Sequence, residues 1–254
     1  MRWPWVVSLA ALAVLLLAPG TPWSVGHGDV LLAAGHPRLA VTWYRWVARA
    51  ALSPDLERRA WRRALIVTEV DLADPVGSAA LLAEQLSTTT GRRHRARILA
   101  DIADNHRRQG DLKQATATWL RAAEEAPRAA SAGDWLLRRA NTLADLGQGD
   151  AADSAFAQLG HAHPEHRGHA WLARARLAQA RGDIHEALKH YDVALENAQQ
   201  PEVAAVARLG AAACLERLGE LDEALVMLDA PALPREVREV RADGLRRRSE
   251  ASVP

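Results

Sequence analysis

Small and apolar residues recur along this chain with the spacing of paired amphipathic helices. One stretch carries them at Trp171, Ala175, Gly182, Ala187, Tyr191 and Ala194. The two stretches before it repeat this order, at Ala103, Gly110, Ala115, Trp119, Ala122 and Pro127, and then at Ala140, Gly147, Ala152, Phe156, Leu159 and Pro164. A glycine between two segments of helical periodicity predicts a helix–turn–helix hairpin, so the pattern predicts a succession of hairpins.

The pattern continues less completely toward both ends of the chain. A later stretch carries Ala212, Gly219, Ala224 and Leu228, then degrades at Pro231, and an early one carries Gly28, Gly35, Ala40, Tyr44 and Pro54. The stretch from residue 55 to residue 91 keeps apolar residues at helical spacing without a clear turn glycine; they are Trp61, Leu65, Leu72, Leu81, Leu82 and Leu86. We predict a helical hairpin there as well.

This repeated order resembles the tetratricopeptide repeat, a unit of about 34 residues that folds as two paired helices. The resemblance implies an all-α fold, a right-handed α-solenoid of about six stacked hairpins at residues 21–54, 55–91, 96–129, 133–166, 168–201 and 205–233. In such repeats small residues let two helices cross closely, and the aromatic fills the gap toward the next hairpin. A C-terminal capping helix at residues 234–248 and a frayed tail at 249–254 complete the expected array.

Local signals agree with the hairpins. Asp111 and Asp183 are each followed three residues later by Gln or Glu, which is the spacing of a helix N-cap and its partner in the first turn. Gly110 and Gly182 fall just past a predicted helix, where a left-handed residue is favoured. The run Ser-Thr-Thr-Thr-Gly-Arg-Arg at residues 87–93 is the best candidate for an internal linker.

The N-terminus has a pattern of its own. Arg2 precedes an uncharged stretch with an apolar core at residues 6–18. This order is typical of a signal peptide, which we place at residues 1–20. An uncleaved membrane anchor is the alternative, although the apolar stretch barely reaches the roughly 17–25 residues that a spanning helix needs. Either interpretation sends the rest of the chain outward, because no further Lys or Arg occurs before Arg38.

The amino-acid composition excludes several classes of function. Lys and Arg total 32 against 31 Asp and Glu, so no strong overall charge attracts nucleic acid. Cys214 is the only cysteine, which excludes an internal disulfide and zinc sites built from cysteine pairs. The sequence contains no glycine-rich phosphate loop after a strand and no nucleophile elbow. We therefore expect a non-catalytic protein without a cofactor.

The resemblance also implies where a partner would bind. Tetratricopeptide proteins usually hold a peptide along a concave groove lined by the first helix of each hairpin. Matched to this chain, the polar groove positions are Arg97, Asp104, Arg107, Arg108, Asn141, Asp145, Arg176 and Gln179. Relatives that clamp a C-terminal carboxylate carry Lys where this chain has Leu137, so a carboxylate clamp is not expected. Ordinary solvated helix residues are the alternative explanation for the whole set.

Two other clusters have a chemical interpretation. Closely spaced imidazoles can ligate a metal ion, and this chain has them at His161, His163, His166 and His169. They flank a predicted turn, so a solvated loop is the favoured explanation. Arginines gather at residues 58, 59, 62 and 63 and at residues 92, 93, 95 and 97, where a solvated helix face is favoured over contact with an acidic partner or anionic lipid. We expect exposed side chains at His94, His106, His185 and His190.

The expected function is protein–protein interaction. The protein would be a scaffold or chaperone-like adaptor in the bacterial envelope, periplasmic or facing the periplasm, with a protein or peptide in its groove. The inner membrane would be a second partner if the N-terminus stays uncleaved. Two alternatives stay open: an accessory subunit of an envelope polysaccharide or cell-wall enzyme complex, and a weak metal-binding protein that uses the loop from His161 to His169.

Overall fold

The computed structural model describes residues 24–229, 239 and 242–245. Every regular element in this part of the chain is a helix, which confirms the all-α prediction. The described residues divide into two compact units, one that ends at Gly110 and one that begins at Asp111. The predicted signal peptide or anchor, the tail and most of the predicted capping helix lie outside the described residues. Within the described ranges, no helix is both long and apolar enough to cross a membrane.

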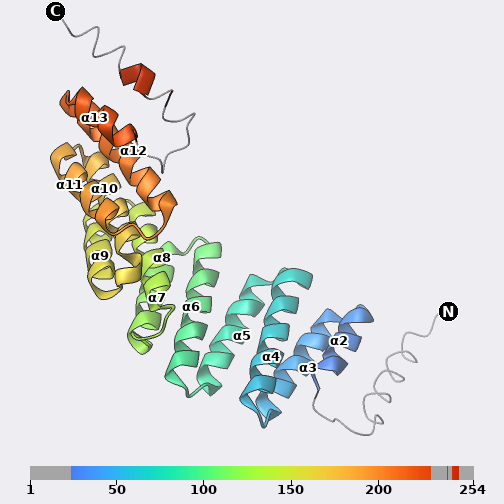
Figure 1. Ribbon diagram of the computed structural model, residues 1–254. Coiled ribbons are helices and arrows are strands. Elements are labelled where there is room, and N and C mark those ends of the chain that lie inside the picture. Colours follow the sequence, from blue (N-terminus) through green and yellow to red (C-terminus); the bar gives the residue numbers. More distant parts are fainter. Residues whose placement is uncertain (1–23, 230–238, 240–241, 246–254) are drawn as a thin grey trace, which may run out of the picture. The chain divides into compact units, whose positions relative to one another are not determined.

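The first unit is a run of helices joined by short turns, each packed on its neighbour in the chain (Figure 1). Its elements are α2 (Val25–Ala33), α3 (Pro37–Ala50), α4 (Pro54–Ile66), the π-helical η1 (Val67–Asp71), α5 (Pro75–Thr88) and α6 (Arg92–Arg108). Proline is the first residue of α3, α4 and α5, where its missing N–H is not needed and its fixed φ suits a helix start.

The second unit repeats the arrangement. Its elements are α7 (Leu112–Glu125), α8 (Ala132–Asp145), α9 (Gly149–Ala162), the 3₁₀ turn η2 (Pro164–His166), α10 (Arg167–Arg181), α11 (Ile184–Glu196), α12 (Pro201–Leu218) and α13 (Leu221–Leu228). Consecutive helices again lie side by side (Figure 1). Leu245, within the predicted capping segment, is buried against Ala212, Leu215 and Leu228 of α12 and α13.

Six turns between helices contain one left-handed residue each. Five are the glycines of the sequence pattern, with φ between 72° and 90°: Gly35, Gly110, Gly147, Gly182 and Gly219. The stretch that lacks a turn glycine uses Ala73 instead, with a φ of 47°. A Cβ at a left-handed position costs roughly 1 kcal/mol relative to glycine. The second hairpin is therefore the one that carries backbone strain.

Small residues occupy the helix crossings, as the repeat pattern predicted. Ala103, Ala115, Ala175 and Ala187 are all 0% exposed. The aromatic positions Tyr44, Trp119, Phe156 and Tyr191 are buried as well. Two helices approach each other most closely where an aromatic ring lies on a glycine. A Cβ at Gly28 would collide with the ring of Tyr44, and a Cβ at Gly210 would collide with the ring of Tyr191. The repeated alanines and aromatics thus belong to the core, whereas the glycines repeated at the turns are exposed.

Both predicted N-cap residues occupy N-cap positions, but only one of them makes the capping hydrogen bond. Asp111 caps α7, and its Oδ1 accepts a hydrogen bond from the backbone N of Gln114 at 3.2 Å. Asp183 occupies the N-cap position of α11, but its side chain accepts no hydrogen bond from the first turn. Its Oδ2 instead accepts a hydrogen bond from Nε of Arg181 at 3.3 Å. A nearby guanidinium therefore outcompetes the backbone N–H for this carboxylate.

The linker predicted at residues 87–93 is shorter in the structure. α5 continues to Thr88 and α6 begins at Arg92, so the two helices are joined by a short connection. Thr89 is buried, and its hydroxyl donates to the carbonyl of Gln85 at 2.8 Å. Nη1 of Arg95 donates to the carbonyls of Leu86 and Thr89, both at 3.1 Å. The boundary between the two units falls after Gly110 instead.

Candidate functional site

One face of α6 carries the predicted groove residues of the first unit. Arg97, Asp101, Asp104 and Arg108 follow each other at intervals of three or four residues, so they lie along one side of the helix. Arg97 and Arg108 are exposed, and Asp104 is half-buried. Arg107 is also exposed. Along this face two acidic side chains lie between cationic ones.

The π-helical η1, which follows α4, contributes Glu69 to the same face. Nη2 of Arg108 donates to Oε1 of Glu69 at 2.7 Å, and Nη1 donates to Oε2 at 3.2 Å. These hydrogen bonds join α6 to η1 and raise the pKa of Arg108. Asp101 keeps exposed surface, yet the crowding of protein groups around its carboxyl, together with the charges of Asp104 and Glu69, raises its pKa to about 6. Sequence reasoning missed Glu69 and Asp101.

The two arginine clusters meet at His94. Burial lowers the pKa of His94, and the positive charges of Arg58 in α4 and Arg97 in α6 act in the same direction. Arg58 also forms an ion pair with Asp55, and Nε of Arg63 lies 3.6 Å from Oδ1 of Asp29. These arginines all belong to the first unit, and nearby carboxylates neutralise part of their charge. They therefore do not form a uniformly basic patch.

The predicted groove residues of the second unit lie on α8 and α10. Asn141 and Asp145 are exposed on α8, and Arg176 is exposed on α10. Gln179 is half-buried, and its Oε1 accepts a hydrogen bond from the hydroxyl of Tyr191 at 2.7 Å. Gln179 therefore holds the aromatic side chain of the next helix, while the other three face solvent.

The four histidine side chains of the loop do not come together around one point. His163 and His166 lie edge to face with ring centroids 6.4 Å apart, whereas His161 is exposed and His169 is half-buried. Nδ1 of His163 lies 3.2 Å from Oε1 of Glu165, and Nε2 of His166 lies 3.5 Å from Oδ1 of Asp134. The described residues contain no group of three or more His, Cys, Asp or Glu side chains arranged to hold a metal ion.

A partly buried network in the second unit was missed by sequence reasoning. Nε and Nη2 of Arg174 donate to the two carboxylate oxygens of Asp153 at 2.9 and 3.1 Å, and the guanidinium carbon lies 4.4 Å from the ring centroid of Trp171. The ring of His190 packs on Trp171 with centroids 5.0 Å apart. His190 is buried, so the prediction that it is exposed is wrong. Burial and the charge of Arg174 lower its pKa.

A pocket of about 310 Å³ opens between α3, η1 and α5 in the first unit. Val41, Leu72 and Leu81 form its apolar lining, and Arg38, Arg45 and Glu84 belong to its polar lining. No motif in the sequence indicated it, because its residues come from two hairpins.

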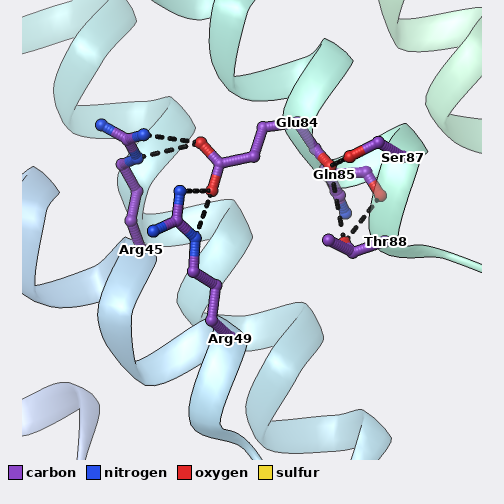
Figure 2. Close-up of polar contacts among 6 residues, drawn as sticks. All are labelled: Arg45, Arg49, Glu84, Gln85, Ser87 and Thr88. Carbon is purple, nitrogen blue, oxygen red and sulfur yellow. Dashed lines mark hydrogen bonds and ion pairs between the residues drawn. The ribbon is translucent and has the colours of Figure 1, made fainter.

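Two arginines of α3 hold Glu84 beside this pocket (Figure 2). Nη2 and Nε of Arg45 donate to Oε2 at 2.7 and 3.1 Å, and Nε of Arg49 donates to Oε1 at 2.7 Å. The hydroxyl of Ser87 donates to the carbonyl of Glu84 at 2.7 Å, which helps to close the last turn of α5. The carboxylate is thus fixed between α3 and α5.

Comparison with known proteins defines the class of fold. No protein-family model matches the chain, and no curated protein sequence matches it. Among solved structures, BtubC from P. vanneervenii superposes with a TM-score of 0.57 at 13% identity, covering 89% of this chain and 94% of that one. A tetratricopeptide repeat protein from Parabacteroides merdae gives 0.52 at 23%, covering 66% and 64%. PilF from Pseudomonas aeruginosa gives 0.51 at 15%, covering 87% and 90%.

The described chain therefore has the tetratricopeptide-repeat fold, an all-α solenoid built from helical hairpins. At these identities the likeness concerns the fold. What the protein binds has to be argued from its own surface.

Proposed function

We propose that this protein is a non-catalytic interaction scaffold, a chaperone-like adaptor that holds a peptide segment of a protein partner against the first helix of each hairpin. The observation that supports it is the face of α6, where exposed arginines flank an acidic pair. Such a face offers charge-assisted hydrogen bonds to an extended peptide, and its order of charges selects peptides that carry the opposite charges at matching positions. The fold suits this role because stacked repeats present long surfaces.

Site-specific photocrosslinking tests the location of binding. A photoreactive amino acid replaces Arg97 or Arg107 on α6, or Arg176 on α10, in the cells that make the protein. Matched probes replace Lys113 on α7 and Gln158 on α9, which are exposed residues of second helices. We expect the same partner at the first three positions and none at the two control positions. Equal capture from both sets would show that the first helices are not the binding surface.

We propose further that the protein acts in the bacterial envelope, on the outer side of the inner membrane. The basis is the sequence of residues 1–20, in which one arginine precedes an uncharged apolar stretch. Alkaline phosphatase fused after residue 229 should be active in this case, because that reporter folds only after export. Deletion of residues 2–20 is the control and should abolish the activity. A fusion that stays inactive with the N-terminus intact would contradict the proposal.

A further inference from the structure

We propose that the pocket between α3, η1 and α5 is a second binding site, which takes an acidic peptide segment of a protein partner. One bulky apolar side chain of the peptide enters the pocket, and a neighbouring carboxylate pairs with Arg38. None of the pocket residues belongs to the groove positions on α6, α8 and α10. The inference therefore extends the proposed function and does not depend on it.

The pocket lies where the second hairpin departs from the regular repeat. The helix that begins at Pro54 passes into the π-helical η1, where the backbone N of Leu72 donates to the carbonyl of Val67, five residues back, at 3.0 Å. π-helical turns interrupt a helix rarely and are frequent at functional sites. α3 and α5 each pack against η1, so this irregular turn lies between the two helices and bounds the pocket.

The inside of the pocket suits an apolar side chain. Val41 and Leu72 are half-buried, so they keep apolar surface in contact with water, while Leu81 closes the interior at 4% exposure. Covering such surface with another apolar group is favourable. The volume of about 310 Å³ lies at the lower end of the roughly 300–1,000 Å³ range for ligand pockets, which fits one bulky side chain better than a large cofactor.

The charged residues at the rim of the pocket favour a peptide that carries a carboxylate next to its apolar side chain. Arg38, Arg45 and Arg49 lie on one side of α3, and the latter two are already paired with Glu84. Arg38 is exposed, and its guanidinium has no hydrogen bond or ion pair with any residue in the described ranges. The other acid at the pocket, Asp74, caps α5 by accepting a hydrogen bond from the backbone N of Gly77 at 2.8 Å. Among the charged side chains that line the pocket, Arg38 is therefore the one left without a partner in the described residues.

Fluorescence anisotropy with labelled peptides tests the site in the full chain. The probe is a Gly/Ser peptide with one Leu followed by Asp, and the comparison peptides carry Ala for Leu or Lys for Asp. We expect the Leu–Asp peptide to bind and both comparison peptides to lose most of the binding. Arg38→Gln should weaken binding of the Leu–Asp peptide about three- to tenfold, because one charge-assisted contact at an exposed rim is lost. Ala80→Phe, which fills the rim, should abolish binding.

Matched variants keep the test interpretable. Arg92→Gln removes an exposed arginine at the start of α6, and Ala83→Phe adds the same ring on an exposed part of α5 away from the pocket. Both should bind the Leu–Asp peptide as the wild type does, and circular dichroism should show unchanged helix content in all four variants. Arg97→Gln should weaken crosslinking on α6 and leave this peptide unaffected, which separates the two proposals.

Three outcomes would overturn the inference. Arg38→Gln and Ala80→Phe could bind the peptide as tightly as their controls, which would place the site elsewhere. The Ala or Lys peptide could bind as well as the Leu–Asp peptide, which would remove the claimed selectivity. Sedimentation could show an oligomer that only the two pocket variants dissociate, which would make a second copy of this chain the occupant.

Discussion

The close helix crossings make a sharp prediction for Ala175→Leu. Ala175 in α10 is 0% exposed and belongs to a cluster with Ala178, Ala187 and Tyr191. A leucine there adds three carbon atoms where no space is available. Overpacking of this kind typically costs about 1–3 kcal/mol. Alanine and leucine have nearly equal helix propensity, so the cost comes from packing alone.

The matched control is Ala180→Leu in the same helix, where the alanine is exposed. Surface substitutions usually change stability by less than about 0.5 kcal/mol. Urea unfolding and thermal unfolding, both followed by circular dichroism, measure the two variants. For a chain of this size, 1 kcal/mol lowers the melting temperature by roughly 2–4 °C, so the buried variant should melt about 2–12 °C below wild type. Equal stability of the two variants would refute the account of the crossing.

Three further predictions concern single sites. Ala73→Gly should stabilise the protein by about 1 kcal/mol in urea unfolding, because it relieves a left-handed Cβ. The lowered pKa of His190 means that the folded state resists its protonation, so stability should fall as the pH drops below about 6.5, and His190→Gln should flatten this part of the pH profile. Asp153→Asn should cost about 2 kcal/mol in the same assay, because Arg174 then lies largely buried without its carboxylate.

Each of these predictions has a control elsewhere in the chain. Ala80→Gly, inside α5, should destabilise by about 1 kcal/mol, opposite in sign to the glycine at position 73. His185→Gln, at an exposed histidine, should leave the pH profile unchanged. Asp150→Asn breaks an exposed pair with Arg181 at 3.9 Å and should cost less than about 1 kcal/mol. If a control variant changed stability or its pH dependence as much as the variant it is paired with, the structural explanation given for that variant would be wrong.

Several features of the fold could be predicted because they repeat at short range. Gly110 and Gly182 indicate turns independently of tertiary contacts, because glycine readily adopts a left-handed φ. The burial of Ala103 and that of Trp119 each follow from the periodicity of their own helix. The candidate groove was predictable to the same extent, as positions on one face of α6. The ion pair that Arg108 makes with Glu69 was not, because those residues are 39 positions apart.

The amino-acid sequence by itself determined which segments are helices, where most of the turns fall and which face of each helix is buried. These properties depend on residues within a few turns of one another, where propensity and periodicity act. Only the tertiary structure decided that His190 is buried on Trp171, that Asp183 turns to Arg181, and that a pocket opens beside η1. Side-chain partners and cavities arise where separate helices pack against each other. The crossing angle and the distance between two helices are set by how their side chains pack.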